Sequence, residues 1–171
     1  MQDWLAFGGN PTHQSFAVIA TRLLVAAVLG ALIGIEREVR NRPAGLRTHM
    51  LVAVAAAAFT LVTFEIYHEM VELNAEIARL DPIRVIEAVT AGVAFLAAGA
   101  IIRSGGAIKG LTTGAGLWMA GAIGVSAGAG FFSVAVLATV LVLVITIVLG
   151  KVEARFLNSS DKDGETDDNA S

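Results

Sequence analysis

The chain has 171 residues, of which 56% are hydrophobic and 16% are charged, and its mean hydropathy is +0.72. An average soluble domain carries about 25% charged residues, so this composition leaves too little polar surface to cover a water-exposed molecule and indicates a membrane protein. The absence of cysteine excludes disulfides, zinc–thiolate sites and cysteine catalysis. The formal charge of −3 conceals an uneven distribution of acids and bases along the chain.

Five apolar stretches are each long enough to form a helix that crosses a membrane. They predict an all-α polytopic membrane protein with spans near 16–35, 49–67, 83–102, 111–127 and 131–149. These spans define a transmembrane domain at 16–150, which is preceded by a short segment at 1–15. Residues 151–171 form an acidic, polar tail, and its lack of apolar periodicity predicts disorder.

The distribution of Lys and Arg predicts how the spans are oriented. Of the 12 Lys and Arg residues, nine fall after the first span, after the third span or in the tail, whereas two fall between the second and third spans. Because cytoplasmic loops carry the excess of positive charge, we expect five spans with the N-terminus outside and the C-terminus in the cytoplasm.

Two charged residues lie well inside predicted spans, Arg22 in the first and Glu87 in the third. An unpaired charge at that depth is costly, so we expect each side chain to find a partner or to reach the headgroups. One interpretation is an ion pair between them that lines a polar pathway. The alternative is a purely structural pair, or two side chains that extend independently to the headgroups.

The loops after the first and third spans contain a second group of candidate residues. Each loop holds a Gly-Leu-x-Thr sequence that opens a helix, with Arg or Lys nearby. Helix N-termini carry free N–H groups and partial positive charge, so these loops predict a site for a phosphate or an anionic lipid headgroup. The alternative is that the threonines only cap helices and the arginines only set the topology. The candidates are Glu36, Arg37, Arg42, Arg47 and Thr48 in the first loop, and Arg103, Gly110, Thr112 and Thr113 in the second.

Small residues recur at four-residue spacing along the fourth predicted span. This spacing predicts a smooth helix face for close packing, either within the protomer or in a dimer. The residues are Gly116, Ala120, Gly124 and Gly128.

Two sequence motifs resemble the signature of the MgtC/SapB family. The first is GALIGIERE at 30–38, continued by RPAGLRTH at 42–49. The second begins with Asp81 and Arg84 and continues with GVAFLAAGAIIR at 92–103, GLTT at 110–113 and LW at 117–118. The resemblance covers nearly the whole predicted transmembrane domain.

The resemblance implies a multi-pass protein of the bacterial inner membrane with five spans. Members of that family help bacteria to cope with low magnesium and help pathogens to survive inside macrophages. The resemblance further implies an action on membrane partners, notably ATP synthase, rather than magnesium transport by the protein itself.

The chain departs from the virulence-type members of that family in several places. Those members carry a soluble ACT-like domain after the fifth span, where this sequence has a short acidic tail, so we expect a short form. They also have an acidic residue where this chain has Ser104, Asn where it has Thr112 and Cys where it has Met119. The first-loop motif, by contrast, is intact.

The sequence leaves two functions open. The first is a membrane regulator that binds another membrane protein through its helices, which the small size and the smooth glycine faces favour. The second is a small oligomeric transporter or channel for Mg²⁺ or an anion, which the intramembrane charges and glycine-rich loops favour. The sequence shows no nucleophile–base pair and no cluster of metal ligands, so we expect no enzymatic activity, metal or cofactor. We expect the lipid bilayer and a second copy of the chain as partners, and no nucleic acid.

Overall fold

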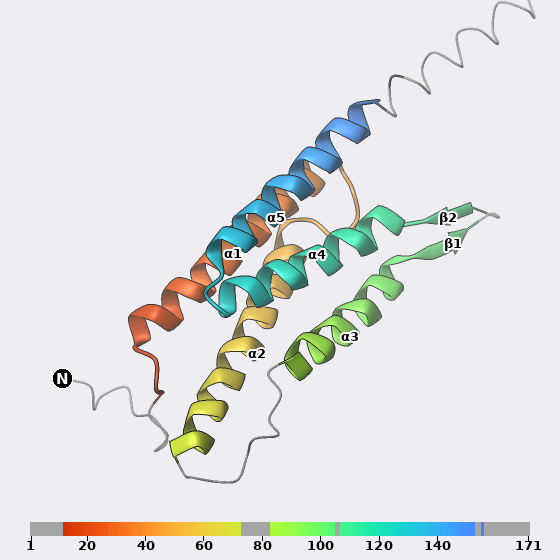
Figure 1. Ribbon diagram of the computed structural model, residues 1–171. Coiled ribbons are helices and arrows are strands. Elements are labelled where there is room, and N and C mark those ends of the chain that lie inside the picture. Colours follow the sequence, from red (N-terminus) through yellow and green to blue (C-terminus); the bar gives the residue numbers. More distant parts are fainter. Residues whose placement is uncertain (1–11, 73–82, 105–106, 153–154, 156–171) are drawn as a thin grey trace, which may run out of the picture.

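The computed structural model describes residues 12–72, 83–104, 107–152 and 155, and it consists of helices joined by short connections (Figure 1). The helices are α1 (Phe16–Val39), α2 (Leu46–Glu72), α3 (Ile83–Ala100), α4 (Leu111–Gly128) and α5 (Phe132–Val144), with a π-helix, η2 (Ile145–Leu149), continuing α5. The helical architecture predicted from the apolar stretches is therefore confirmed. The predicted N-terminal segment before residue 12 and nearly all of the predicted acidic tail lie outside the described residues.

Four helices of the described chain are long and apolar enough to cross a membrane. They are Phe16–Val39, Leu46–Glu72, Ile83–Ala100 and Phe132–Val152. The predicted fourth span, α4, is not among them. Its composition reflects its position, because α4 packs against α1, α2, α3 and α5 and so carries small residues where a lipid-facing helix carries large apolar ones.

Three helices form the tightly packed part of the bundle, with α2 lying against both α1 and α4 (Figure 1). On α1, a Cβ atom placed at Gly34 would lie 2.5 Å from the Cα of Leu46, and one at Gly30 would lie 2.8 Å from the carbonyl oxygen of His49. On α4, a Cβ at Gly128 would lie 2.6 Å from the carbonyl oxygen of Ala57. Only glycine permits these approaches, so the two helix interfaces depend on it.

A short β-hairpin separates α3 from α4 and was not predicted. Strand β1 (Ile102–Ser104) pairs antiparallel with β2 (Ala107–Lys109), with Ile102 opposite Lys109. Helix α3 therefore ends at Ala100, two residues before the predicted end of the third span. The Gly-Gly sequence between the strands is a hairpin signal that the apolar stretch before it obscured.

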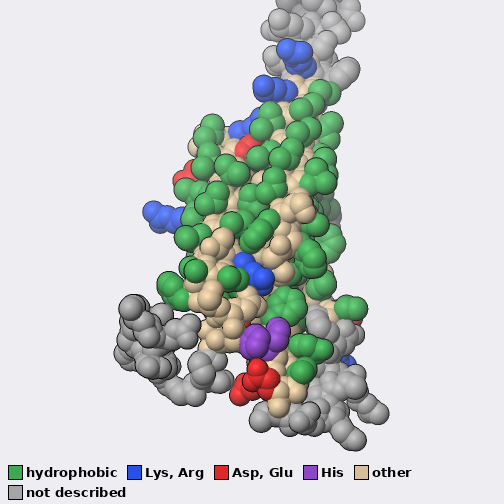
Figure 2. All heavy atoms as spheres, turned by 60° about the vertical axis from the view of Figure 1, so that its left-hand side comes forward, with side chains coloured by type: hydrophobic (Ala, Val, Ile, Leu, Met, Phe, Trp, Pro, Cys, Tyr) green, Lys and Arg blue, Asp and Glu red, His purple; other side chains and the backbone are tan. Residues whose placement is uncertain are grey.

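The surface is apolar along the middle of the molecule and charged toward its ends. Figure 2 shows hydrophobic side chains covering the flank, with Lys and Arg gathered toward the end where α5 terminates and a His and acidic group near the other end. At that second end, the carboxylate of Glu65 accepts hydrogen bonds from the backbone N–H groups of His13 and Gln14. An apolar belt between polar ends is the pattern expected of a protein embedded in a bilayer.

Candidate functional site

The C-terminal end of α1, the N-terminal end of α2 and the first turn of α4 meet at one end of the bundle. We call this region the junction site, and it comprises Glu36, Arg37, Glu38, Arg40, Gly45, Leu46, His49 and Thr113. The chain turns from α1 to α2 through two left-handed residues, Asn41 at φ 52° and Ala44 at φ 56°. Arg42-Pro43 lies between them, and the proline helps to end α1 because the residue before a proline avoids helical geometry.

Arg37 is the buried charge of the junction site. Its side chain is 6% exposed, and its Nη2 atom donates a hydrogen bond to Oγ1 of Thr113 at 2.5 Å. Among the described residues, its Nε atom has no hydrogen-bond partner. This contact joins the two candidate loops, because Arg37 belongs to the first motif and Thr113 to the second.

Glu36 precedes Arg37 but bonds along its own helix. Its Oε1 atom lies 2.8 Å from Nε of Arg40, one turn later, and 9% of the glutamate side chain is exposed. Its Oε2 atom is buried and accepts no hydrogen bond from any described residue. A nearly buried carboxylate with a spare acceptor oxygen is therefore available beside the Arg37 guanidinium.

Glu38 caps the N-terminus of α2. Its Oε2 atom accepts a hydrogen bond from the backbone N–H of Leu46 at 2.8 Å. A carboxylate at a helix N-terminus satisfies a free N–H group and complements the helix dipole. One free N–H group at this helix start is thus satisfied by a carboxylate of the protein itself, and the anion site expected at these loops stays a prediction.

His49, the last residue of the first motif, lies fully buried in the first turn of α2. Its Nδ1 atom is 3.1 Å from the carbonyl oxygen of Gly45, so Nδ1 carries the proton in this contact because a carbonyl only accepts. Its Nε2 atom is buried without a partner among the described residues and faces Gly116, where an added Cβ would lie 3.2 Å away. In the sequence, this buried polar position is marked by a single histidine at the start of an apolar helix.

The other predicted loop residues lie outside the buried contacts. Arg42, Arg47 and Thr48 are exposed, and so is Thr112 on α4. Gly110 precedes α4 with φ 92°, and a Cβ there would overlap the carbonyl oxygen of Ala100, so its role is conformational. Among the remaining candidates, Arg103 lies in β1.

The structure does not bring Arg22 and Glu87 together as a pair. Nη1 of Arg22 donates a hydrogen bond to the carbonyl oxygen of Gly128 at 2.9 Å, at the C-terminal end of α4. Carbonyl groups at a helix C-terminus lack intrahelical donors and attract cations, which explains this choice. Glu87 is exposed on α3, and α3 packs mainly on α4 rather than on α1.

The predicted small-residue face of α4 lies against α2 within the protomer. All four of its residues are buried, and a Cβ at Gly124 would overlap the carbonyl oxygen of Ala53. Within the protomer this face is therefore covered by α2.

An apolar helical bundle in which several described helices are long and apolar enough to cross a membrane is the fold of a membrane protein. Residues 23–155 match the model of the MgtC family, and the chain belongs to this family. The motif residues gathered in the junction site all lie within the matched region.

Curated relatives support the same assignment. Protein MgtC of Brucella abortus strain 2308 is 42% identical over 130 residues, covering 76% of this chain and 50% of that protein. YhiD of Escherichia coli K12, whose name gives magnesium transport as a provisional function, is 34% identical over 139 residues, covering 81% of this chain and 64% of that protein. A protein of Haemophilus influenzae Rd is 40% identical over 136 residues, covering 79% of this chain and 56% of that protein.

The chain thus spans between half and two thirds of the length of these relatives. No solved structure matches it.

Proposed function

We propose that the chain is a regulator of other membrane proteins, linked to growth at low magnesium or to membrane energetics. The observation that carries this proposal is the closed interior of the bundle. The centre of the described helices is filled by side chains that are 0 to 1% exposed, namely Ala26, Ile33, Ala53, Ala57, Ile123 and Ala127. Packing of this kind leaves no polar route between α1, α2 and α4, which disfavours conduction through one protomer.

The proposal places the protein in the bacterial inner membrane as five spans with the N-terminus outside. In this arrangement α4 also crosses the membrane, with most of its residues packed against the other helices. The junction site then lies at the cytoplasmic face, together with most of the Lys and Arg residues. The distribution of side chains in Figure 2 supports this orientation, because the basic end and the acidic end lie on opposite sides of the apolar belt.

The proposed regulator acts through helix contacts on its apolar flank. A membrane protein partner such as ATP synthase, which the family resemblance implies, would bind there, and so would a second copy of the chain. A change in the conformation of the cytoplasmic loops would alter that flank through the junction site, because Arg37 connects α1 to α4. No enzymatic step enters this proposal.

Complementation of a deletion strain at low magnesium tests the proposal. We expect Arg37→Gln to fail to restore growth, because it removes the charge that bridges the two motifs, whereas the exposed Arg42→Gln restores it. Membrane abundance of each variant is measured by immunoblot, and crosslinking in membranes identifies what the wild-type chain binds. Recovery of self-oligomers alone, with no other membrane protein, would contradict the regulator.

The alternative function is a transporter, and the name of the relative YhiD favours it. Mg²⁺ prefers several oxygen ligands, and the described residues contain no group of three or more acidic, His or Cys side chains that could hold a metal ion. Flux of Mg²⁺, H⁺ or phosphate into proteoliposomes containing the purified chain would establish this alternative in place of the regulator.

A further inference from the structure

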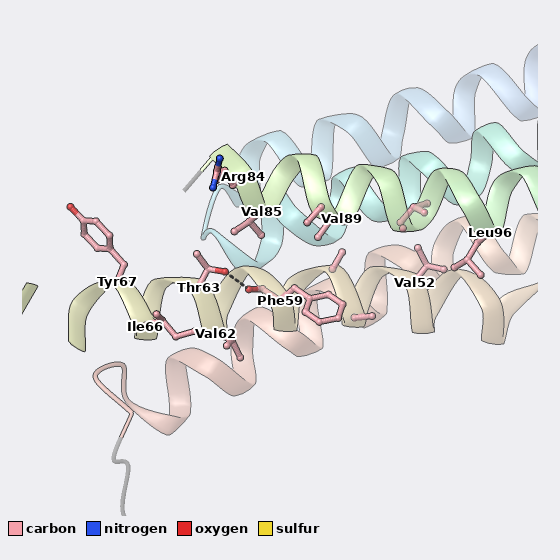
Figure 3. A pocket seen from close by; sticks show the side chains of 15 residues that line it. Val52, Phe59, Val62, Thr63, Ile66, Tyr67, Arg84, Val85, Val89 and Leu96 are labelled. Carbon is pink, nitrogen blue, oxygen red and sulfur yellow. Dashed lines mark hydrogen bonds between the residues drawn. The ribbon is translucent and has the colours of Figure 1, made fainter. Parts of the chain in front are cut away.

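An open groove runs between α2 and α3 on the flank of the bundle (Figure 3). Its volume is about 690 Å³, and both helices line it along their length. The groove exists because α3 packs on α4 rather than on α2. Val93 of α3 lies against Gly121 of α4, where an added Cβ would be 2.9 Å from the valine Cγ2, so α3 is packed closely on α4.

The groove is apolar except at one end. Figure 3 shows Arg84 and Tyr67 at that end, whereas Val52 and Leu96 lie at the other. The hydroxyl of Thr63, which also lines the groove, donates to the carbonyl oxygen of Phe59 in its own helix at 2.9 Å and so presents little polarity. The lining therefore matches an amphiphilic ligand, because it is cationic at one end and apolar along the rest of the groove.

The length of the groove matches one leaflet of a bilayer. Arg84 and Leu96 are separated by 12 residues of a single helix, which corresponds to about 18 Å at 1.5 Å per residue. Half of a hydrocarbon core of about 30 Å is about 15 Å. A lipid acyl chain that follows the groove would thus keep its headgroup at the level of Arg84.

We propose that this groove binds one anionic phospholipid, with an acyl chain along α2 and α3 and its phosphate at Arg84 and Tyr67. Arg offers a forked set of donors that suits phosphate, and a phenolic hydroxyl adds another donor. Among the described residues, Arg84 forms no ion pair. This proposal does not rest on the regulator proposed above.

The groove of about 690 Å³ falls within the range of small-molecule sites, which is about 300–1,000 Å³.

Filling the groove tests the position of the acyl chain. Gly92 lines the groove, and a Cβ there would meet nothing within 4 Å, so Gly92→Leu adds a side chain to the open space without a backbone clash. Gly99 lies two turns further along α3 with equally open surroundings but does not line the groove, so Gly99→Leu is the matched control. Native mass spectrometry of the purified full chain with phosphatidylglycerol measures the bound lipid. We expect Gly92→Leu to lower its occupancy about fivefold or more, and Gly99→Leu to leave it unchanged.

A second pair of variants tests the headgroup. Wild type is expected to prefer phosphatidylglycerol over phosphatidylcholine by about fivefold, the effect of one basic residue at a membrane surface. Arg84→Gln should abolish this preference, and Arg84→Lys should retain it. Equal binding of the two lipids by the wild type, or full lipid binding by Gly92→Leu, would overturn the proposal. Loss of self-association in Gly92→Leu with lipid binding intact would assign the groove to a second copy instead.

Discussion

Arg37 shows how much of the junction site depends on a single side chain. It is a nearly buried cation whose one hydrogen bond to a described side chain crosses from α1 to α4. A buried charge that loses its partner keeps the cost of desolvation without the compensating bond. The hydroxyl of Thr113 is consequently more important for stability than its modest polarity implies.

Thr113→Val tests this dependence. The substitution keeps the shape of the side chain but removes the acceptor of the Arg37 bond, so we expect the free energy of unfolding to fall by about 1–3 kcal/mol. Thr113→Ser keeps the hydroxyl and should remain close to wild type. Thermal unfolding of the purified protein in detergent measures the effect. Thr112→Val, at the exposed neighbouring position, is the control, and equal melting of both valine variants would contradict the assigned bond.

At the scale of helices, glycine has different roles at different places. On α1 and α4 it permits backbone contact with α2, whereas at two positions on α3 it faces open space. The residues at the predicted four-residue spacing on α4 lie on the side of that helix that contacts α2. The partner of that face followed only from the structure, since small-residue spacing carries no information on which helix will cover it.

Gly124→Ala and Gly92→Ala separate these roles. A methyl group at Gly124 overlaps the backbone carbonyl of Ala53, which cannot rotate away, so α2 and α4 must separate at a cost of about 1–3 kcal/mol. The same change at Gly92 meets nothing and improves helix propensity, so stability should stay constant or rise. Unfolding in mixed micelles with increasing SDS compares the two variants. A Gly92→Ala protein that is the less stable of the two would contradict this account.

Apolar length was sufficient to locate the helices but not their contacts. Arg22 illustrates the difference, because its partner is the backbone carbonyl of Gly128, and backbone acceptors have no sequence signature. Glu38 illustrates it again, since its cap on Leu46 depends on how the intervening turn reverses the chain. The β-hairpin escaped prediction because Ile101 and Ile102 continue the apolar run of α3.

At the scale of the whole molecule, the position of α4 decides the topology. The helix packs against α1, α2, α3 and α5 and is rich in glycine and alanine, and it is not among the described helices that are long and apolar enough to count as spans. If α4 crosses the membrane, the turn after it and the turn after α1 lie on opposite faces. If α4 does not cross, the two turns share one face.

Single cysteines distinguish these topologies, because the chain contains none of its own. We expect a membrane-impermeant maleimide to label Ala129→Cys in intact spheroplasts but to label Asn41→Cys only after permeabilisation. Labelling of both residues after permeabilisation confirms that each site is reactive. Labelling of both from the same side in intact spheroplasts would exclude five spans.

The three consecutive residues Glu36, Arg37 and Glu38 contact three different helices. Successive residues point about 100° apart around a helix, so the first turns along α1, the second reaches α4 and the third reaches α2. Gly34 lies one turn before Glu38 on the side that faces α2. The directions of these three side chains around α1 are therefore set relative to the helix face on which Gly34 contacts α2. Inserting one residue between Gly34 and Glu36 would rotate all three side chains together, and the bonds from Arg37 to Thr113 and from Glu38 to Leu46 would be lost at once.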